Sequence, residues 1–176
     1  MKQEPVSIVL KTYNRANIIG KAIESVLAQT YTDFELLIID DGSKDRTEQI
    51  VASYNDKRIS YYCMLENEGQ SKARNCGIQM AKYDYLASED SDDLWRPEKL
   101  EVQMKAIKNA ASDVGMVYHK FRYDLGEGRS MTLPDQKIPL ENKSGDIYRQ
   151  LLWDNLVEMP TILIKKRMCR SCGRNG

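Results

Sequence analysis

The segment 34-FELLIIDDGSKDRT-47 decides the fold, because an apolar run passes directly into two aspartates and a glycine. The run from Phe34 to Ile39 is typical of a strand buried in a parallel sheet. The following residues, Asp40 to Ser43, break both strands and helices and therefore indicate a turn. In a parallel α/β sheet, ligands collect beyond the carboxyl ends of the strands, so this turn is a candidate binding segment.

The same pattern recurs on both sides of that segment. VSIVL (6–10) is another short apolar run, and the apolar residues between Ile18 and Leu27 recur at helical spacing. Alternating strands and helices continue to about residue 113. The predicted elements are a helix around Ile50–Tyr54, a strand 59–64, a helix 73–81, a strand 83–87 ended by the acidic run 88–93, and a helix after Pro97. Four alternations predict an α/β fold with a mostly parallel sheet and right-handed crossovers.

The last third of the chain is less regular. VGMVY (114–118) predicts one more buried strand, and residues 120–129 predict an edge strand that turns at Gly126 and Gly128. The remaining expectations are a loop over 131–143, a short helix around Ile147–Leu152 and a final strand over 161–164.

Composition limits the function classes. The chain has 176 residues, of which 41% are hydrophobic and 30% charged, as expected for one globular domain. Equal numbers of basic and acidic residues, 26 each, predict no general attraction to nucleic acid. The first residues, MKQEP, show no secretion signal, no apolar run reaches the ~20 residues that span a bilayer, and we expect a cytoplasmic protein.

The four cysteines are expected to be reduced thiols. Cys169 and Cys172 form a CxxC pair, but a zinc site needs a second pair of ligands, which the lone His119 cannot supply. No zinc site is therefore predicted.

Polar residues follow three of the predicted strands. They are the segments Lys11–Arg15, Asp40–Asp41 and Asp90–Asp93. An aromatic ring, a hydrogen-bond acceptor and a carboxylate cluster at one sheet edge suit a nucleotide with a metal-bound diphosphate. The GxGxxG of dehydrogenases and the GxxxxGK[ST] of P-loop NTPases are absent, whereas a phosphatase with an aspartate nucleophile would leave the first two segments unexplained.

Four segments resemble the inverting glycosyltransferases of family 2, which have the GT-A fold. They are VSIVLKTYNR (6–15), LAQTYTDFELLIIDDGSKDRT (27–47), NEGQSKARNCGI (67–78) and YLASEDSDDLW (85–95). The resemblance implies a nucleotide-diphospho-sugar transferase fold in which helices flank a mostly parallel central sheet. It also implies one domain over 1–176, with a nucleotide-sugar-binding half at 5–113 and the start of an acceptor-side half at 114–176.

The resemblance assigns roles position by position. Tyr13 would flank the nucleobase, Asp41 would accept a hydrogen bond from its imide N–H, and Asp92 of the DxD motif would bind Mg²⁺ or Mn²⁺. The implied nucleotide-binding residues are Thr12, Tyr13, Asn14, Arg15, Asp41, Arg74 and Asp90. Alternatives stay open, because Asp41 could be a turn or helix cap, the arginines solvated helix charges and the DxD segment a solvated acidic loop.

Three departures from the family pattern stand out. Lys11 lies where the family usually has proline, and Ser88-Glu89 lie where two apolar residues usually end the strand. A charged Glu89 is therefore expected to face the site or to strain the sheet. The family's general base lies in a later acidic motif, which we expect beyond Gly176; Glu158 and His119 are the late candidates within the chain.

The implied activity is transfer of a sugar from a nucleotide-diphosphate sugar, with UDP-sugar favoured, to a glycan or lipid-linked acceptor in cell-envelope polysaccharide synthesis. Peripheral association with the inner face of the membrane is compatible with such an acceptor. The alternative is a truncated or degenerate module that binds a nucleotide sugar without turnover.

Overall fold

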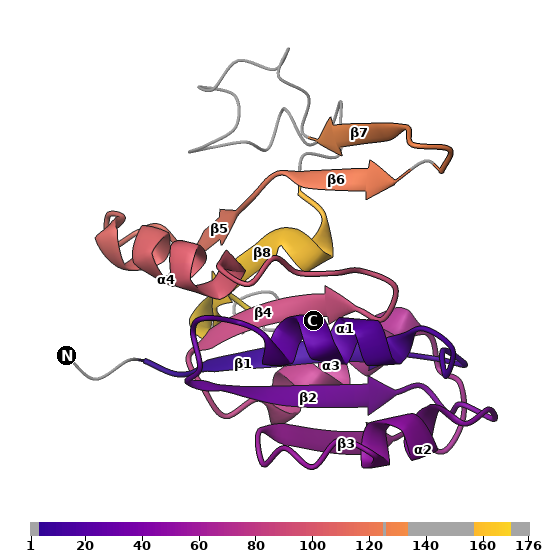
Figure 1. Ribbon diagram of the computed structural model, residues 1–176. Coiled ribbons are helices and arrows are strands. Elements are labelled where there is room, and N and C mark those ends of the chain that lie inside the picture. Colours follow the sequence, from indigo (N-terminus) through magenta and orange to yellow (C-terminus); the bar gives the residue numbers. More distant parts are fainter. Residues whose placement is uncertain (1–3, 125, 134–156, 170–176) are drawn as a thin grey trace.

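A computed structural model describes residues 4–124, 126–133 and 157–169. Its centre is a six-stranded sheet in the order β3-β2-β1-β4-β8-β5 (Figure 1). The sheet strands are β1 (Val6–Thr12), β2 (Phe34–Asp40), β3 (Ile59–Cys63), β4 (Tyr85–Asp90), β5 (Met116–Tyr118) and β8 (Ile162–Lys165). The helices are α1 (Ile19–Leu27), α2 (Thr47–Ala52), α3 (Gln70–Met80) and α4 (Lys99–Asn109), with 3₁₀ turns η2 (Met159–Thr161) and η3 (Lys166–Met168).

The first four strands run parallel, as their apolar composition predicts. β1 pairs with β2 on one side and with β4 on the other, and β2 pairs with β3. Parallel neighbours require crossover connections, which α1, α2 and α3 supply. The predicted α/β fold with a mostly parallel sheet flanked by helices is therefore confirmed.

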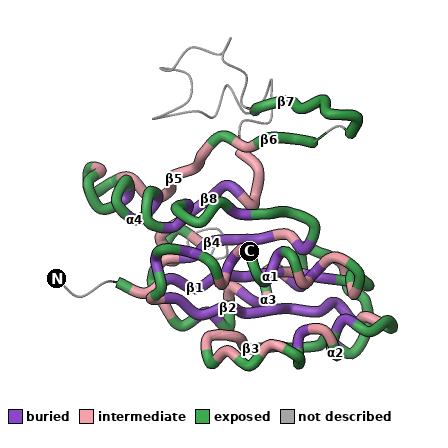
Figure 2. Tube along the Cα trace, in the orientation of Figure 1, coloured by how far each residue is buried: buried purple, intermediate pink, exposed green. Residues whose placement is uncertain are grey.

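Two apolar layers, one on each face of the sheet, hold the helices to it, and Figure 2 shows that the central strands are largely buried. Ile8, Leu10 and Ile38 face α1, α2 and α4, whereas Val9 and Ile39 face α3. Burial of each such side chain contributes about 1.5–3 kcal/mol to the stability of the parallel half.

Gly77 brings α3 close to the sheet. A Cβ atom at this position would collide with the side chains of Val9 and Ile39. The small residues on this helix face predict such a close approach, and the structure confirms it. As a result α3, which carries Arg74, lies directly against β1 and β2.

The end of β4 corrects one prediction. The acidic run was expected to end the strand at Ala87, but β4 continues through Ser88 and Glu89 to Asp90. Its extra residues pair with β1, so that Glu89 lies opposite Leu10 and Asp90 opposite Lys11. Pairing with a central strand thus outweighs the low strand propensity of acidic residues.

The last third differs more from expectation. β5 is a three-residue, half-buried strand rather than a fully buried one, and β8 runs antiparallel between β4 and β5. The expected edge strand is instead the first arm of a hairpin, in which β6 (Phe121–Asp124) pairs with β7 (Ser130–Leu133). β7 also occupies the start of the segment predicted as a loop, while the rest of that loop and the helix expected around Ile147–Leu152 lie outside the described residues.

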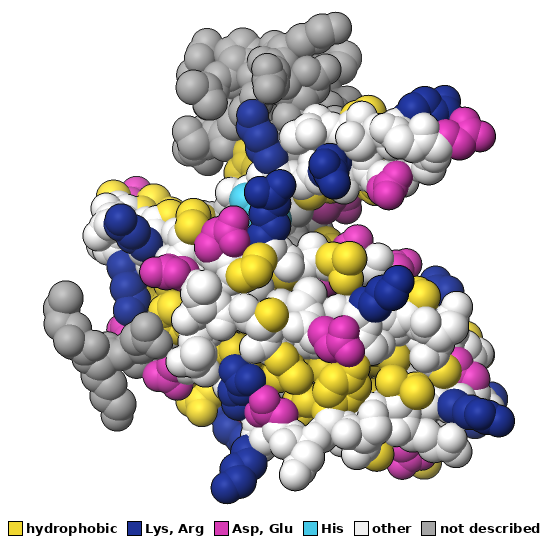
Figure 3. Space-filling view, in the orientation of Figure 1, with side chains coloured by type: hydrophobic (Ala, Val, Ile, Leu, Met, Phe, Trp, Pro, Cys, Tyr) yellow, Lys and Arg dark blue, Asp and Glu magenta, His cyan; other side chains and the backbone are white. Residues whose placement is uncertain are grey.

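Figure 3 shows basic and acidic side chains intermixed on the face that carries α1, α2 and α4. Of the helices in the described part of the chain, none has the length and apolar character needed to cross a bilayer.

Candidate functional site

The loops after β1 and β2 are joined to each other. Asn14 adopts a left-handed conformation with φ 51°; its N–H donates to Ser43 Oγ at 2.7 Å, and its Oδ1 accepts from the Lys44 N–H at 2.8 Å. The Asp45 carboxylate adds an acceptor for the Ala16 N–H at 3.0 Å. Asn14 therefore shapes the loop that carries Tyr13 and Arg15.

Asp40 anchors the turn after β2 from inside the protein. It is fully buried, and its carboxylate accepts hydrogen bonds from the Tyr61 hydroxyl at 2.6 Å and the Ser43 N–H at 2.8 Å. Burial and this bond to a carboxylate raise the pKa of Tyr61. Gly42 follows with φ +77°, where a Cβ would meet the backbone of Glu66.

Asp41 joins the same turn to α3. Its two carboxylate oxygens accept hydrogen bonds from the N–H groups of Glu68 and Gly69, both at 2.8 Å. Only 3% of the residue is exposed. Each oxygen keeps a further lone pair, so this helix-start role and recognition of a ligand donor are compatible.

A cleft of about 410 Å³ opens at the carboxyl ends of β1, β2 and β4, a size typical of ligand sites. Tyr13, which is 42% exposed, supplies its aromatic surface. The lining residues are Lys11, Thr12, Tyr13, Arg15, Asp41, Asn67, Gly69, Gln70, Ala73, Asp90, Ser91 and Asp92.

Most of the residues predicted to bind the nucleotide meet in this cleft, together with Asp92, which was predicted to bind the metal. Thr12, Tyr13, Arg15, Asp41, Asp90 and Asp92 line it. Asn14 is not in the lining and instead supports the loop, and Arg74 borders the cleft through Asp90. Asn67 and Gln70 also line the cleft, although the sequence analysis assigned them no role. Their position in the NEGQ segment, which resembles the family, is the sequence signal that could have identified them. The ligand roles of all these residues stay predictions.

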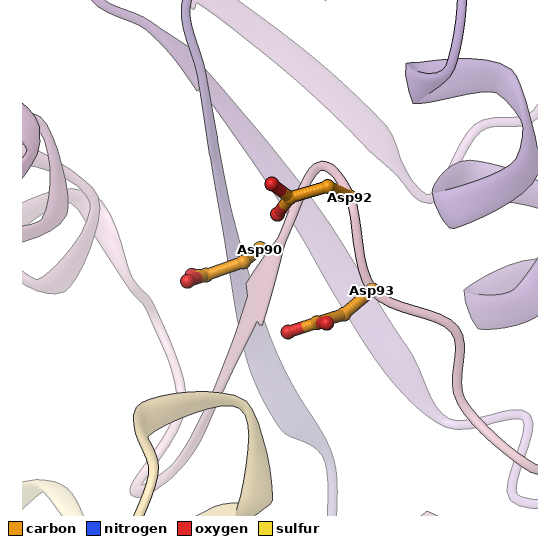
Figure 4. A group of neighbouring side chains, drawn as sticks. All are labelled: Asp90, Asp92 and Asp93. Atoms are coloured by element: carbon orange, nitrogen blue, oxygen red, sulfur yellow. The ribbon is translucent and has the colours of Figure 1, made fainter. Parts of the chain in front are cut away.

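Three carboxylates gather at the turn after β4. Figure 4 shows the side chains of Asp90, Asp92 and Asp93 pointing to the same side, and a ligand oxygen from each lies within 4.8 Å of the others. Asp90 Oδ1 is buried without a hydrogen-bond partner. Partial burial and the charges of Asp90 and Asp92 raise the pKa of Asp93 to about 6. An all-carboxylate group of this size fits a hard divalent cation such as Mg²⁺ or Mn²⁺.

Basic side chains surround the carboxylates. Lys11 Nζ lies 2.9 Å from Asp90 Oδ1, Arg74 approaches the same oxygen at 3.8 Å, and Arg15 approaches Asp92 at 3.8 Å. Lys11 and Arg74 are largely enclosed, with 13% and 16% of their side chains exposed. The cleft therefore presents both charge signs to a ligand.

Glu89 does not face the cleft. It shares the sheet face of Ala87 and Leu10, is fully buried, and neither of its carboxylate oxygens has a hydrogen-bond partner. Burial raises its pKa well above the ordinary value, and the positive charge of Lys99 opposes that rise. Lys99 itself rests 3.5 Å above the Trp95 ring and donates to Gln103.

The late candidates for a general base are not among the residues that line the cleft. The charge of Glu158 contributes to the raised pKa of Asp93, which places it near the acidic turn. Burial lowers the pKa of His119, whose Nδ1 lies 2.7 Å from the Lys120 carbonyl oxygen. Among the described residues, the cleft lining contains neither a glutamate nor a histidine.

The sheet order and the acidic turn after β4 define a GT-A domain. The chain belongs to the family described as Glycosyl transferase family 2, whose model matches residues 7–167. It is similar to an uncharacterised glycosyltransferase of Rickettsia typhi, with 36% identity over 92% of this chain and 52% of that protein. The chain thus spans about half the length of that relative.

Two further relatives carry more specific names. UDP-Glc:alpha-D-GlcNAc-diphosphoundecaprenol beta-1,3-glucosyltransferase WfgD of Escherichia coli is 40% identical over 61% of this chain and 43% of that protein. The crystal structure of S. aureus TarS 1-349 in complex with UDP superposes with a TM-score of 0.74 and 25% identity, covering 95% of this chain and 48% of that one.

Proposed function

We propose that this chain forms the donor-binding part of a glycosyltransferase that uses a UDP-sugar and transfers the sugar to a glycan or lipid-linked acceptor in envelope polysaccharide synthesis. The observation that carries the proposal is the cleft that places Tyr13, Asp41 and the acidic turn at one sheet edge. The name of the Escherichia coli relative, with a UDP-glucose donor and a diphosphoundecaprenol-linked acceptor, supports this choice of substrates. Such an acceptor also favours peripheral association of the protein with the inner face of the membrane.

The residues divide the donor between them. Tyr13 offers an exposed ring to the base, and Asp41, already fixed by two backbone N–H groups, offers its remaining lone pairs to the uracil imide. Thr12 adds a buried hydroxyl without a partner, and Asn14 holds the loop in place. Arg15 and Arg74 supply positive charge for the diphosphate, since guanidinium groups suit bidentate phosphate contacts.

Asp92 would hold Mg²⁺ or Mn²⁺, with Asp90 and Asp93 beside it. Such an ion supplies Lewis-acid stabilisation of the charge that grows on the leaving nucleoside diphosphate. Asp90, which lies between Lys11 and Arg74, would accept a hydrogen bond from a ribose hydroxyl.

A binding module without turnover is the second candidate function. The two late base candidates, Glu158 and His119, are not in the described cleft lining, which favours it, because an acceptor hydroxyl needs a base within hydrogen-bond reach. Loss of general-base assistance typically costs ~10²–10⁴ in rate.

Release of UDP from UDP-sugars, with and without candidate acceptors, tests the proposal and separates the two candidates. We expect donor binding with slow, acceptor-independent release, and less release from Asp92→Asn than from the matched surface variant Asp113→Asn. Brisk acceptor-dependent release would favour a base within these residues, and Glu158→Gln and His119→Gln would locate it. Failure of every UDP-sugar to bind in Mn²⁺ would contradict both candidates.

A further inference from the structure

Lys11 is a charged residue on a central strand, and the donor site as described above gives it no task of its own. It lies on β1 directly opposite Asp90 on β4, and both side chains project to the sheet face that α3 covers. Its ammonium group is 2.9 Å from Asp90 Oδ1, and only 13% of its side chain is exposed. The lysine is therefore fixed at the floor of the cleft rather than free in solvent.

The Lys11–Asp90 contact is an ion pair without the geometry of a hydrogen bond. Asp90 Oδ1 is buried and lacks a hydrogen-bond partner, and so does Nε of Arg74, whose Nη2 lies 3.8 Å from that oxygen. Asp90 Oδ1 is thus held by charge between two cations and accepts no directional bond. The two cations offset the negative charge of this carboxylate.

The charges at the acidic turn after β4 balance. Asp90, Asp92 and Asp93 supply three negative charges, and Lys11, Arg74 and Arg15 supply three positive charges within 4 Å of two of those carboxylates. A free divalent cation gains little from a group whose charge is already compensated. A nucleoside diphosphate adds negative charge beside the basic residues, and the cation then becomes the missing counter-charge.

We propose that Lys11 controls when the divalent cation binds. Its ammonium group offsets the negative charge of Asp90 next to Asp92, so that a free cation binds weakly, and the cation binds together with the nucleoside diphosphate and not before it. The joint binding of cation and nucleoside diphosphate rests on the proposed function, whereas the effect of Lys11 on the free cation does not.

The effect of Lys11 on the free cation is tested without nucleotide, by measuring Mn²⁺ binding with electron paramagnetic resonance. Lys11→Met should bind Mn²⁺ at least about tenfold more tightly than the unaltered chain, because an opposing charge a few ångströms away has gone. Lys11→Arg keeps the charge and should stay within about threefold. Lys105→Met, which removes an exposed lysine from α4 on the other sheet face, should leave the affinity unchanged.

The same measurement with UDP added tests whether the cation binds together with the nucleoside diphosphate. UDP should strengthen Mn²⁺ binding more in the unaltered chain than in Lys11→Met, since the variant has already lost the opposing charge. Equal or weaker Mn²⁺ binding by Lys11→Met than by the unaltered chain would overturn the inference. If Lys11→Met does not fold, Lys11→Gln takes its place in every arm. Failure of UDP to bind any variant in Mn²⁺ would instead overturn the proposed function.

Discussion

The carboxylate of Asp41 accepts a hydrogen bond from the backbone N–H of Gly69 at 2.8 Å, which fixes the end of β2 to the start of α3. The neighbouring Glu68 N–H binds the other oxygen. These bonds connect two loops that are distant in sequence and lie on one side of the cleft. Asp41, which is proposed to recognise the nucleobase, therefore also stabilises the loops around it.

Asp41→Ala should lower both stability and base selectivity. Two part-buried N–H groups lose their acceptor, so the free energy of unfolding should fall by about 1–2 kcal/mol in urea denaturation. Calorimetry should show a reduced preference for UDP over ADP. Asp45→Ala, which also disturbs the loops but not the proposed base contact, is the matched control. An unchanged preference in Asp41→Ala would leave the aspartate with its structural role alone.

Tyr13→Ala should weaken the binding of every nucleotide to a similar degree. Stacking of a base on an aromatic ring contributes about 1–3 kcal/mol and tolerates any base. Because Tyr13 is 42% exposed, the thermal unfolding midpoint should hardly move. Tyr13→Phe keeps the ring and should bind normally. Unaltered affinity of Tyr13→Ala for UDP, ADP and GDP alike would remove the ring from the site.

Gly77→Ala should be destabilising because the new methyl group collides with Val9 and Ile39 and forces α3 away from the sheet. We expect a loss of about 1–3 kcal/mol in the free energy of unfolding, together with weaker UDP binding as Arg74 moves. Asn75→Ala, on the exposed face of the same helix, should stay within about 0.5 kcal/mol. Equal stability of the two variants would show that α3 does not pack as described.

Asp93→Asn should change the pH dependence of stability. Partial burial and the charges of Asp90 and Asp92 raise the pKa of Asp93 to about 6 in the folded state, against an ordinary 3.8. Between pH 3.8 and pH 6 the carboxyl group of Asp93 is protonated in the folded chain but ionised in the unfolded chain. Asp93 therefore lowers the free energy of unfolding progressively as pH rises through this range, and the full loss is reached above pH 6.

The asparagine variant should therefore be more stable than the unaltered chain at pH 7.5, by about 1 kcal/mol, because solvent reaches Asp93 and screens part of its charge interactions. The difference should vanish at pH 4. Urea denaturation at both pH values measures it, and a constant difference across the range would refute the raised pKa.

The parallel half of the fold was predictable because local signals suffice there. The FELLII run of β2 and the small face of α3 each specify burial without reference to distant residues. The extent of β4 was not predictable in this way, since the partners that admit Glu89 and Asp90 into a strand, Leu10 and Lys11, lie far away in sequence. β8 pairs antiparallel through contacts equally distant along the chain.

The candidate site was predictable as a set of segments but not as a set of contacts. The turns after β1, β2 and β4 were expected at one sheet edge, and they meet there. The sequence could not show that Asn14 binds the turn after β2, or that Lys11 and Arg74 flank the same oxygen of Asp90. Such pairings depend on side-chain directions that only the folded sheet fixes.

The central claim is that the cleft binds a nucleoside diphosphate together with a divalent cation held by Asp92. Titration calorimetry with UDP, in Mn²⁺ and in EDTA, measures this directly. We expect UDP to bind at least about tenfold more tightly in Mn²⁺, because the cation offsets repulsion between the diphosphate and the acidic turn, and Asp92→Asn to abolish the difference. Equal affinity for UDP in Mn²⁺ and in EDTA would contradict the claim.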